Sequence, residues 1–403
     1  MIRRSDCVKK FKHIVLVLCC IAAAGLFTGC KISIELPFGN DQSSSWNGLS
    51  GTPSRVTPPD YSVTDTMERY DYSHKKTLTE AQTEIYNLLI YMLDHKQSSF
   101  DFENIGNDDF KKAYYAVLYD HPEYIRTGFN YTYSVKTTGD YVQFHAEPAL
   151  LFDDPDELDI AEQELESAVS SIVNTAKAQP DPYYIVKYVH DYIIDNTVYD
   201  VDVLAGAQSS EGLIVASTAY GCLVQHKAVC SGYSAAFQLI MQRLGVECGR
   251  INGTKLTESG AHQWNYVCLD GEYYFIDLTW DDPLADNGVD SRTYDYFLIS
   301  DADIAYTHVS DRTCPQPVCS GIRYNYFYYN GLYFDEYDFR YVSDAAERMR
   351  ENNTISVKFS TPDQLQRAVE ELVEGQRIFE LDFVNGGITY SVSTSGCILN
   401  IDY

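Results

Sequence analysis

The chain has 403 residues, enough for roughly two to three domains, and 45% of them are hydrophobic, so we expect a sizeable core and exclude a disordered chain. Lys and Arg number 30 against 58 Asp and Glu, which gives a net charge of -28. Nucleic-acid binding needs clustered basic side chains, so this charge balance excludes nucleic acid as an expected partner.

Residues 1–29 have the pattern of an export signal peptide. A basic segment precedes an apolar run, Ile14–Phe27, that is shorter than the ~20 residues of a membrane-spanning helix. The small residues Thr28 and Gly29 then lead to Cys30, which resembles a bacterial lipobox, although Phe27 stands where Leu is usual. We therefore expect lipidation of Cys30 and a protein held on the membrane, outside the cytoplasm, by a lipid anchor. Free secretion after ordinary cleavage is the alternative.

Residues 30–72 are rich in Ser, Gly, Pro, Asp and Thr without periodicity, which predicts a flexible tether. Residues 73–180 are expected to form an N-terminal α+β region. Its predicted elements are, in chain order, a helix over Leu78–Leu93 with Thr79 as N-cap, a helix over Asp108–Tyr119, a hairpin that turns at Thr137–Gly139, and a helix over Asp156–Lys177.

Residues 181–321 are expected to form the core that carries the chemistry. This core begins with an amphipathic helix, DPYYIVKYVHDYIIDNTVYD, in which Ile185, Val189 and Ile193 form one apolar stripe. His190 lies on the same helix among apolar neighbours. We interpret it as a core or groove histidine, which is the commoner role of a histidine in such a place.

The stretch AVCSGYSAAFQLIMQRLG predicts a buried helix, because its apolar residues recur at helical spacing and Gly245 provides a stop. Cys230 falls at the start of this helix, where unpaired backbone N–H groups and the helix dipole stabilise an anion. A cysteine there has a lowered pKa, and the thiolate is the reactive form. Cys230 is therefore a candidate nucleophile, although a free cysteine is more often a small buried hydrophobic residue.

The stretch AHQWNYVCLDGEYYFIDLTWDDP predicts two strands joined by a turn at Asp270-Gly271. The register of a two-residue turn places His262 and Asp277 on one face of the hairpin as diagonal neighbours. A carboxylate beside an imidazole fixes its tautomer and stabilises its charge, as the third member of a catalytic triad does. Trp264 lies on the same face, where it either shields this contact from water or simply packs the sheet.

The stretches KAVCSGYS, AHQWNYVCLDGEYYFIDLTWDDP and YDYFLIS resemble the bacterial branch of the transglutaminase-like superfamily. The resemblance covers about Tyr183–Ser300. It implies a papain-like fold, in which a nucleophile helix packs on an antiparallel sheet. It also carries the role of nucleophile to Cys230, of base to His262 and of orienting acid to Asp277.

An oxyanion donor upstream of the cysteine is common in that family, and Gln225 and Tyr220 are the candidates here, beside the backbone N–H of Cys230. The expected reaction is acyl transfer through a Cys thioester, with hydrolysis of a peptide bond or a Gln carboxamide as its outcome. The expected partner is a peptide or protein substrate, with cell-wall peptide as one example. Protein crosslinking and a non-catalytic binding or scaffold module are the alternatives. No cofactor and no metal are expected.

The chain contains 11 Cys, of which four lie in the signal peptide and lipobox, so seven remain. An odd number leaves at least one thiol unpaired within a monomer. Cys314 and Cys319 are near enough in sequence for a local disulfide, which spacing alone does not establish. The series Cys222, His226, Cys230 lacks the C-x2-C spacing of structural zinc sites, so a metal-dependent hydrolase is the weaker hypothesis.

Residues 322–403 predict a small separate α+β module. The expected elements are a hairpin over Tyr324–Asp338 that turns at Asn330-Gly331, a strand in TISVKFS, a helix opened by Thr361-Pro362, and strands in RIFELDFV and ITYSVSTSGCILNIDY. The module shows no catalytic constellation, so we expect a binding or spacing role. Taken together, the predicted elements place the chain in the α+β class.

Overall fold

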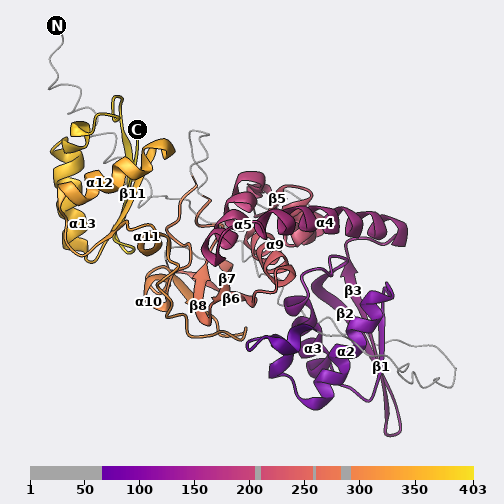
Figure 1. Ribbon diagram of the computed structural model, residues 1–403. Coiled ribbons are helices and arrows are strands. Elements are labelled where there is room, and N and C mark those ends of the chain that lie inside the picture. Colours follow the sequence, from indigo (N-terminus) through magenta and orange to yellow (C-terminus); the bar gives the residue numbers. More distant parts are fainter. Residues whose placement is uncertain (1–65, 205–209, 257–259, 283–291) are drawn as a thin grey trace, which may run out of the picture. The chain divides into compact units, whose positions relative to one another are not determined.

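The computed structural model describes residues 66–204, 210–256, 260–282 and 292–403 (Figure 1). The predicted signal peptide, the lipidation site Cys30 and most of the predicted tether lie outside the described residues. In the part of the chain that is described, no helix combines the length and apolar character that crossing a membrane requires. The described chain is α+β with largely antiparallel sheets, which confirms the predicted fold class.

The N-terminal α+β region follows the predicted order of elements. It consists of the 3-10 turns η1 (Thr66–Arg69) and η2 (His74–Thr77), then α2 (Glu80–Asp94), β1 (Phe100–Glu103), α3 (Asn107–Asp120), β2 (Thr127–Thr138), β3 (Tyr141–Leu150) and α4 (Pro155–Ala176). Thr79 caps α2 as predicted, and Gln82 completes a capping box. The predicted hairpin is confirmed, because Thr138 pairs with Tyr141, and β1, which was not predicted, pairs with β3.

The central region builds one antiparallel sheet with the order β8-β7-β6-β9. Its elements are α5 (Pro182–Asn196), β4 (Val198–Tyr199), α6 (Val201–Leu204), α7 (Ser210–Ala216), α8 (Ala219–Leu223), β5 (Lys227–Ala228), α9 (Cys230–Arg243), β6 (Cys248–Lys255), β7 (Ala261–Leu269), β8 (Glu272–Ile276), α10 (Asp301–Ile304) and β9 (His308–Ser310). Leu269 pairs with Glu272 across Asp270-Gly271, so the predicted hairpin register is confirmed.

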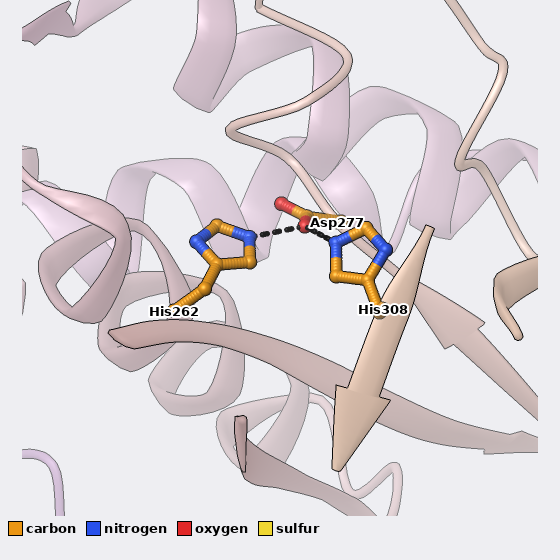
Figure 2. A group of neighbouring side chains, drawn as sticks. All are labelled: His262, Asp277 and His308. Carbon is orange, nitrogen blue, oxygen red and sulfur yellow. Dashed lines mark hydrogen bonds and ion pairs between the residues drawn. The ribbon is translucent and has the colours of Figure 1, made fainter. Parts of the chain in front are cut away.

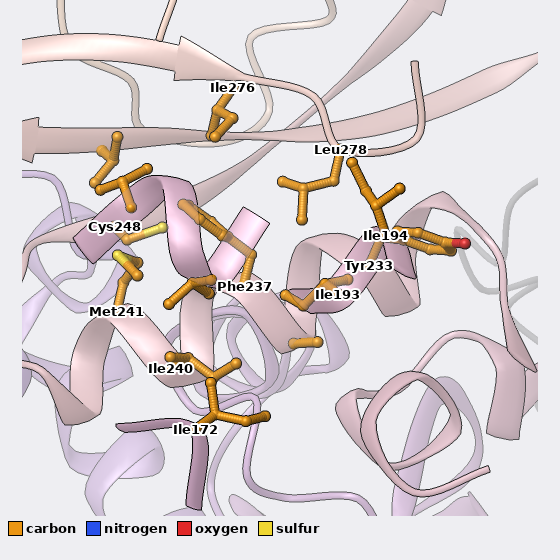
Figure 3. Packing of buried hydrophobic residues seen from close by; sticks show 14 of the residues in the cluster. Ile172, Ile193, Ile194, Tyr233, Phe237, Ile240, Met241, Cys248, Ile276 and Leu278 are labelled. Carbon is orange, nitrogen blue, oxygen red and sulfur yellow. The ribbon is translucent and has the colours of Figure 1, made fainter. Parts of the chain in front are cut away.

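Helix α9 packs on this sheet through both polar and apolar contacts. The Ser234 hydroxyl donates to the Gln263 carbonyl of β7 at 3.1 Å, and the Asn265 amide donates to the Ser234 carbonyl at 3.0 Å. Figure 3 shows Phe237 and Ile240 of the same helix within a buried apolar cluster that also contains residues of α4, α5 and β8. The helix ends before Gly245, whose φ of +81 suits a glycine stop. A nucleophile helix on an antiparallel sheet is the arrangement that the resemblance implied.

The C-terminal module differs from its prediction in two places. It contains α11 (Tyr326–Tyr329), β10 (Tyr333–Phe334), α12 (Phe339–Met349), η3 (Arg350–Asn352), β11 (Thr354–Phe359), α13 (Pro362–Ala368), η4 (Val369–Glu374), η5 (Arg377–Glu380), β12 (Thr389–Ser393) and β13 (Ile398–Asp402). These strands form a sheet with the order β10-β11-β13-β12, in which β10 is parallel to β11. The predicted strand in RIFELDFV is wrong, because η5 there turns Ile378 into the core of the module.

The predicted hairpin over Tyr324–Asp338 is also wrong. Asn325 caps a short helix there, and two tyrosine rings of α11 stack on rings of the central region: Tyr326 on Tyr294 at 4.1 Å and Tyr329 on Tyr183 at 3.7 Å. Asn330-Gly331 still turns the chain, but the residues before it form this helix instead of a strand. The residues just after the predicted boundary at 322 thus pack on the central region as well as on the module.

All seven cysteines of the described chain are free thiols, so no disulfide joins Cys314 and Cys319. Both are buried in the apolar cluster that contains Trp264 and Tyr266, where they serve as small packing residues.

Candidate active site

Cys230 is the first residue of α9, as the sequence predicted, and Val229 is the N-cap with extended backbone. The residue is only 5% exposed. The backbone N–H of Gln263 and the side chain of His262 lie near its sulfur and lower the pKa of the thiol. The nucleophile helix and strand β7 therefore meet at the thiol.

His262 and Asp277 form the contact that the hairpin register predicted. Imidazole Nε2 lies 2.5 Å from carboxylate Oδ2, and both side chains are buried (Figure 2). A carboxylate only accepts hydrogen bonds, so Nε2 must be the donor. The other ring nitrogen, Nδ1, is therefore the one that serves Cys230.

Asp277 is held on both of its oxygens. Oδ1 accepts from the backbone N–H of Thr279 at 3.0 Å, from the Thr279 hydroxyl at 2.6 Å and from the backbone N–H of Trp280 at 3.2 Å. Oδ2 accepts from His262 and also from Nε2 of His308 at 3.0 Å (Figure 2). The carboxylate is thus fixed by the turn that follows its own strand and faces two imidazoles.

The electrostatics of the three side chains favour separated charges. Burial alone raises the pKa of the Cys230 thiol, but the hydrogen bond and charge of His262 outweigh it and hold that pKa below its usual range. Burial opposes the charging of His262, yet the charge of Asp277 raises the pKa of the imidazole to about 10. Burial also opposes ionisation of Asp277, but His262 and His308 hold the pKa of this carboxyl well below its usual range. A thiolate–imidazolium pair beside an ionised aspartate is therefore expected at neutral pH.

Aromatic rings enclose the two imidazoles. Trp264 stacks near His262 at 6.0 Å, and Trp280 lies 4.4 Å from the ring of His308. Tyr296 completes the enclosure at 5.5 Å from His308. Trp264 is 2% exposed, so the structure gives it both roles considered from the sequence: it packs the sheet and covers the His–Asp contact.

The sequence did not point to two residues that contact this site. Tyr199, from β4, lies near Cys230, whose charge adds to burial in raising the pKa of the Tyr199 phenol, and His308 comes from the edge strand β9. Tyr199 lies in the helix-ending stretch NTVYD, and His308 follows the helical turn α10, so neither stands in a pattern that marks catalysis. Their positions depend on how distant segments pack.

The oxyanion candidates Gln225 and Tyr220 have other partners. The Gln225 amide donates to the Tyr220 hydroxyl at 3.0 Å, and that hydroxyl donates to Glu164 of α4 at 3.0 Å. Within the described ranges, no hydrogen bond joins either side chain to Cys230. Tyr199, and not these two, is the upstream residue whose hydroxyl reaches the nucleophile.

His190 is a core histidine, as predicted. It is fully buried, and its ring bonds Asp191 through Nδ1 at 3.0 Å and Asp281 through Nε2 at 3.2 Å. Asp281 also accepts from the Thr293 hydroxyl and the Tyr296 backbone. This network connects α5 to the loop after β8, which supports a structural role for His190 and Asp281.

In the described part of the chain, the one group of side chains with donor atoms close enough for a metal ion is His262, Asp277 and His308, whose atoms lie within 4.8 Å of one another. The series Cys222, His226, Cys230 does not form such a group, and the Cys222 sulfur lies 3.4 Å from the Thr197 hydroxyl. Ligands of a tetrahedral zinc ion lie about 3.3 Å apart. The N–O separations of 2.5 and 3.0 Å at Asp277 fit hydrogen bonds instead.

One family model matches the central part of the chain. The family model described as the Transglutaminase-like superfamily matches residues 170–278, a stretch that contains Cys230, His262 and Asp277 but ends before His308. None of the curated proteins matches the chain.

Among solved structures, the chain is similar to a crystal structure of a TGase, with 16% identity over 41% of this chain and 47% of that chain and a TM-score of 0.29. It is also similar to a candidate cysteine protease from Cytophaga hutchinsonii (13% identity, 34% of this chain, 53% of that chain, TM-score 0.24). A candidate protease from Parabacteroides distasonis gives 7% identity, 37% and 43% coverage and a TM-score of 0.21. The chain spans about half the length of these solved structures. Over residues 170–278, the chain is similar to the transglutaminase-like superfamily.

Proposed function

We propose that the protein is a cysteine acyl-transfer enzyme that hydrolyses a peptide bond or a Gln carboxamide. The observation that carries this proposal is the placement of Cys230 at the start of a buried helix near His262, whose imidazole in turn bonds Asp277. A lowered thiol pKa and a raised imidazole pKa together supply a nucleophile and a proton donor in one pair.

The reaction runs in two halves. The Cys230 sulfur forms a bond to the carbonyl carbon, and Nδ1 of His262 gives its proton to the leaving amine as the C–N bond breaks. Water then attacks the thioester, Nδ1 takes a proton from that water, and the C–S bond breaks to release the acid. Asp277 keeps the proton on Nε2 throughout, so Nδ1 can cycle between donor and acceptor.

We assign the oxyanion donors to the backbone N–H of Cys230 and the hydroxyl of Tyr199. In the resting site Tyr199 lies near both the backbone N–H and the sulfur of Cys230. A substrate carbonyl oxygen that displaces the phenol oxygen from the N–H would lie within reach of both donors. Tyr199→Phe should therefore lower acyl transfer by about 10²-fold, while the alkylation rate of Cys230 changes by only a few fold.

The test combines a chemical and a proteomic assay. Cys230 of the wild type should react with a thiol alkylator at a rate that is independent of pH near neutrality, and wild type but not Cys230→Ala should cleave or deamidate cell-wall peptides or extracted proteins. An alkylation rate equal to that of free cysteine would favour the non-catalytic binding module. The control is Cys222→Ser, because Cys222 is a buried thiol in the same region whose pKa burial raises.

Protein crosslinking is a second candidate, and the enclosure of the site favours it. Cys230 is 5% exposed and the aromatic rings of Trp264 and Trp280 cover the base, which limits access of water to a thioester. A primary amine added to the assay separates the two outcomes. Hydrolysis predicts that acid products dominate at millimolar amine, whereas crosslinking predicts amide products.

The location of the protein is part of the same proposal and is inferred from the predicted export signal. We propose that the protein is held at the outer face of the membrane by a lipid on Cys30 and acts on peptides or proteins outside the cytoplasm. Metabolic labelling with a fatty-acid analogue should mark the wild type and not Cys30→Ala. Label retained in that variant would refute the anchor.

A further inference from the structure

A second histidine shares the aspartate of the triad. His308 is 4% exposed, and its Nε2 lies 3.0 Å from Oδ2 of Asp277, the same oxygen that accepts from His262 (Figure 2). The two imidazole rings lie 5.3 Å apart. Because a carboxylate oxygen only accepts, both Nε2 atoms must carry protons, whatever the charge of either ring.

The fold holds His308 in place by specific contacts. Its strand β9 pairs with β6, where Lys255 lies opposite His308 and Gly253 lies opposite Ser310. A Cβ on Gly253 would meet the Val309 carbonyl oxygen at 2.1 Å, so β9 approaches this closely only because residue 253 is glycine. The Thr307 hydroxyl lies 2.8 Å from Nδ1 and fixes the other side of the ring.

Two donors on one oxygen compete for its charge. Each additional hydrogen bond stabilises the carboxylate and so weakens its hold on the proton of the other partner. The remaining titratable groups that face this cluster are Cys230 of α9, Tyr199 of β4 and Tyr296, while the Lys255 ammonium lies 5.6 Å from the Trp280 ring. None of these donates to Oδ2 among the described contacts, so His308 is the competitor of His262.

We propose that His308 is a positioning residue of the triad, an inference that rests on the proposed acyl-transfer function. His308 limits the strength of the Asp277–His262 hydrogen bond. It thereby keeps the His262 imidazolium acidic enough to protonate the leaving amine. Oδ1 of Asp277 is already fixed by three other hydrogen bonds. The distinctive effect of His308 is therefore on the acidity of His262 and less on the placement of the carboxylate.

Three substitutions test this inference. His308→Leu keeps a similar volume without a donor, His308→Asn has an amide too short to reach Oδ2, and His308→Gln keeps a nitrogen donor near the place of Nε2. The assay measures how fast iodoacetate alkylates Cys230 and divides this rate by that of iodoacetamide. This ratio falls at the pH where the neighbouring imidazolium loses its charge. Loss of the His308 hydrogen bond to the charged carboxylate would move this fall upward by about one pH unit.

In His308→Leu and His308→Asn, the pH at which this rate ratio falls should move upward. In His308→Gln, it should move by a few tenths of a pH unit at most. The Nε2–H proton of His262, observed by NMR in protein with ¹⁵N-labelled histidine, should move downfield in the first two variants alone. The inference would be overturned if the pH at which the rate ratio falls is unchanged or lower in these variants and the proton resonance does not move. If wild-type Cys230 reacts no faster than free cysteine, the proposed function fails, and the proton resonance still decides the role of His308.

Discussion

Asp277→Asn is the substitution that tests the triad most directly. An asparagine has one oxygen, so its NH₂ must face either the donors of the 279–280 turn or the two imidazoles. The backbone N–H groups of Thr279 and Trp280 cannot become acceptors, whereas an imidazole can change its tautomer. The amide nitrogen should therefore face His262, which must then carry its proton on Nδ1 and can no longer act as a base toward Cys230.

The size of the effect follows from the imidazole. The pKa of His262 is raised from 6.5 to about 10, mainly because the charge of Asp277 outweighs burial. A shift of about 3.5 units corresponds to about 5 kcal/mol of stabilisation of the imidazolium. Since tenfold in rate is about 1.4 kcal/mol and part of this energy will be recovered by relaxation, we expect acyl transfer to fall by about 10³-fold. We also expect the Cys230 thiol pKa to rise towards its usual range.

The assay is the second-order rate of alkylation by iodoacetamide from pH 4 to 10, read by intact mass and assigned to Cys230 by peptide mapping. Wild type should show a plateau that begins below the usual thiol pKa, and Asp277→Asn should lose it. Asp281→Asn is the matched control, because Asp281 is an equally buried aspartate whose Oδ2 lies 3.2 Å from Nε2 of His190. A wild-type plateau in Asp277→Asn, or the same loss in Asp281→Asn, would refute the assignment of the triad.

Three further predictions follow from the structure. Gly253→Ala should lower the free energy of unfolding by about 1–3 kcal/mol, because the new Cβ would overlap the Val309 carbonyl oxygen. Thermal unfolding measures this loss, with Gly106→Ala as the control, because no atom lies within 4 Å of a Cβ built on Gly106. Burial opposes the charging of His74, but the hydrogen bond to Asp120 raises the pKa of His74 to about 9. The contribution of this pair to stability is therefore complete below pH 6.5 and is lost between pH 6.5 and about 9. The melting temperature of the wild type should thus fall more over this range than that of His74→Gln, and parallel curves would contradict the pairing. Thr279→Val removes the hydroxyl that donates to Oδ1 of Asp277. By the same reasoning as for His308, the pH at which the iodoacetate-to-iodoacetamide rate ratio of Cys230 falls should move upward, and an unchanged pH would contradict this role of the hydroxyl.

Several features of the site could be predicted because the signals are local. The helical spacing after Cys230 and the stop at Gly245 placed the thiol at a helix start, and the structure has it there. The Asp270-Gly271 turn sets the register of β7 and β8, and the side-chain period of two then brings Asp277 to His262. Each of these inferences needs only residues that are close along the chain.

One expectation failed where distant segments compete with a local preference. Asn330-Gly331 does turn the chain, yet the segment before it is the helix α11 and not a strand, and its tyrosines stack on rings from α5 and from the loop before α10. Buried aromatic stacking outweighs the local preference for a strand there. The spacing of Cys314 and Cys319 left a disulfide open, and both are thiols in an apolar cluster.

The α+β class, the cysteine at a helix start and the paired imidazole and carboxylate could be inferred from the amino-acid sequence, because hydrogen bonds and side-chain periodicity within one element or hairpin are set by neighbouring residues. The approach of Tyr199 to Cys230 and the sharing of the Asp277 carboxylate by His308, 31 residues further along, appear only once the chain is folded. Those contacts depend on close packing between separate elements, such as the approach of β9 over Gly253, which no local pattern encodes.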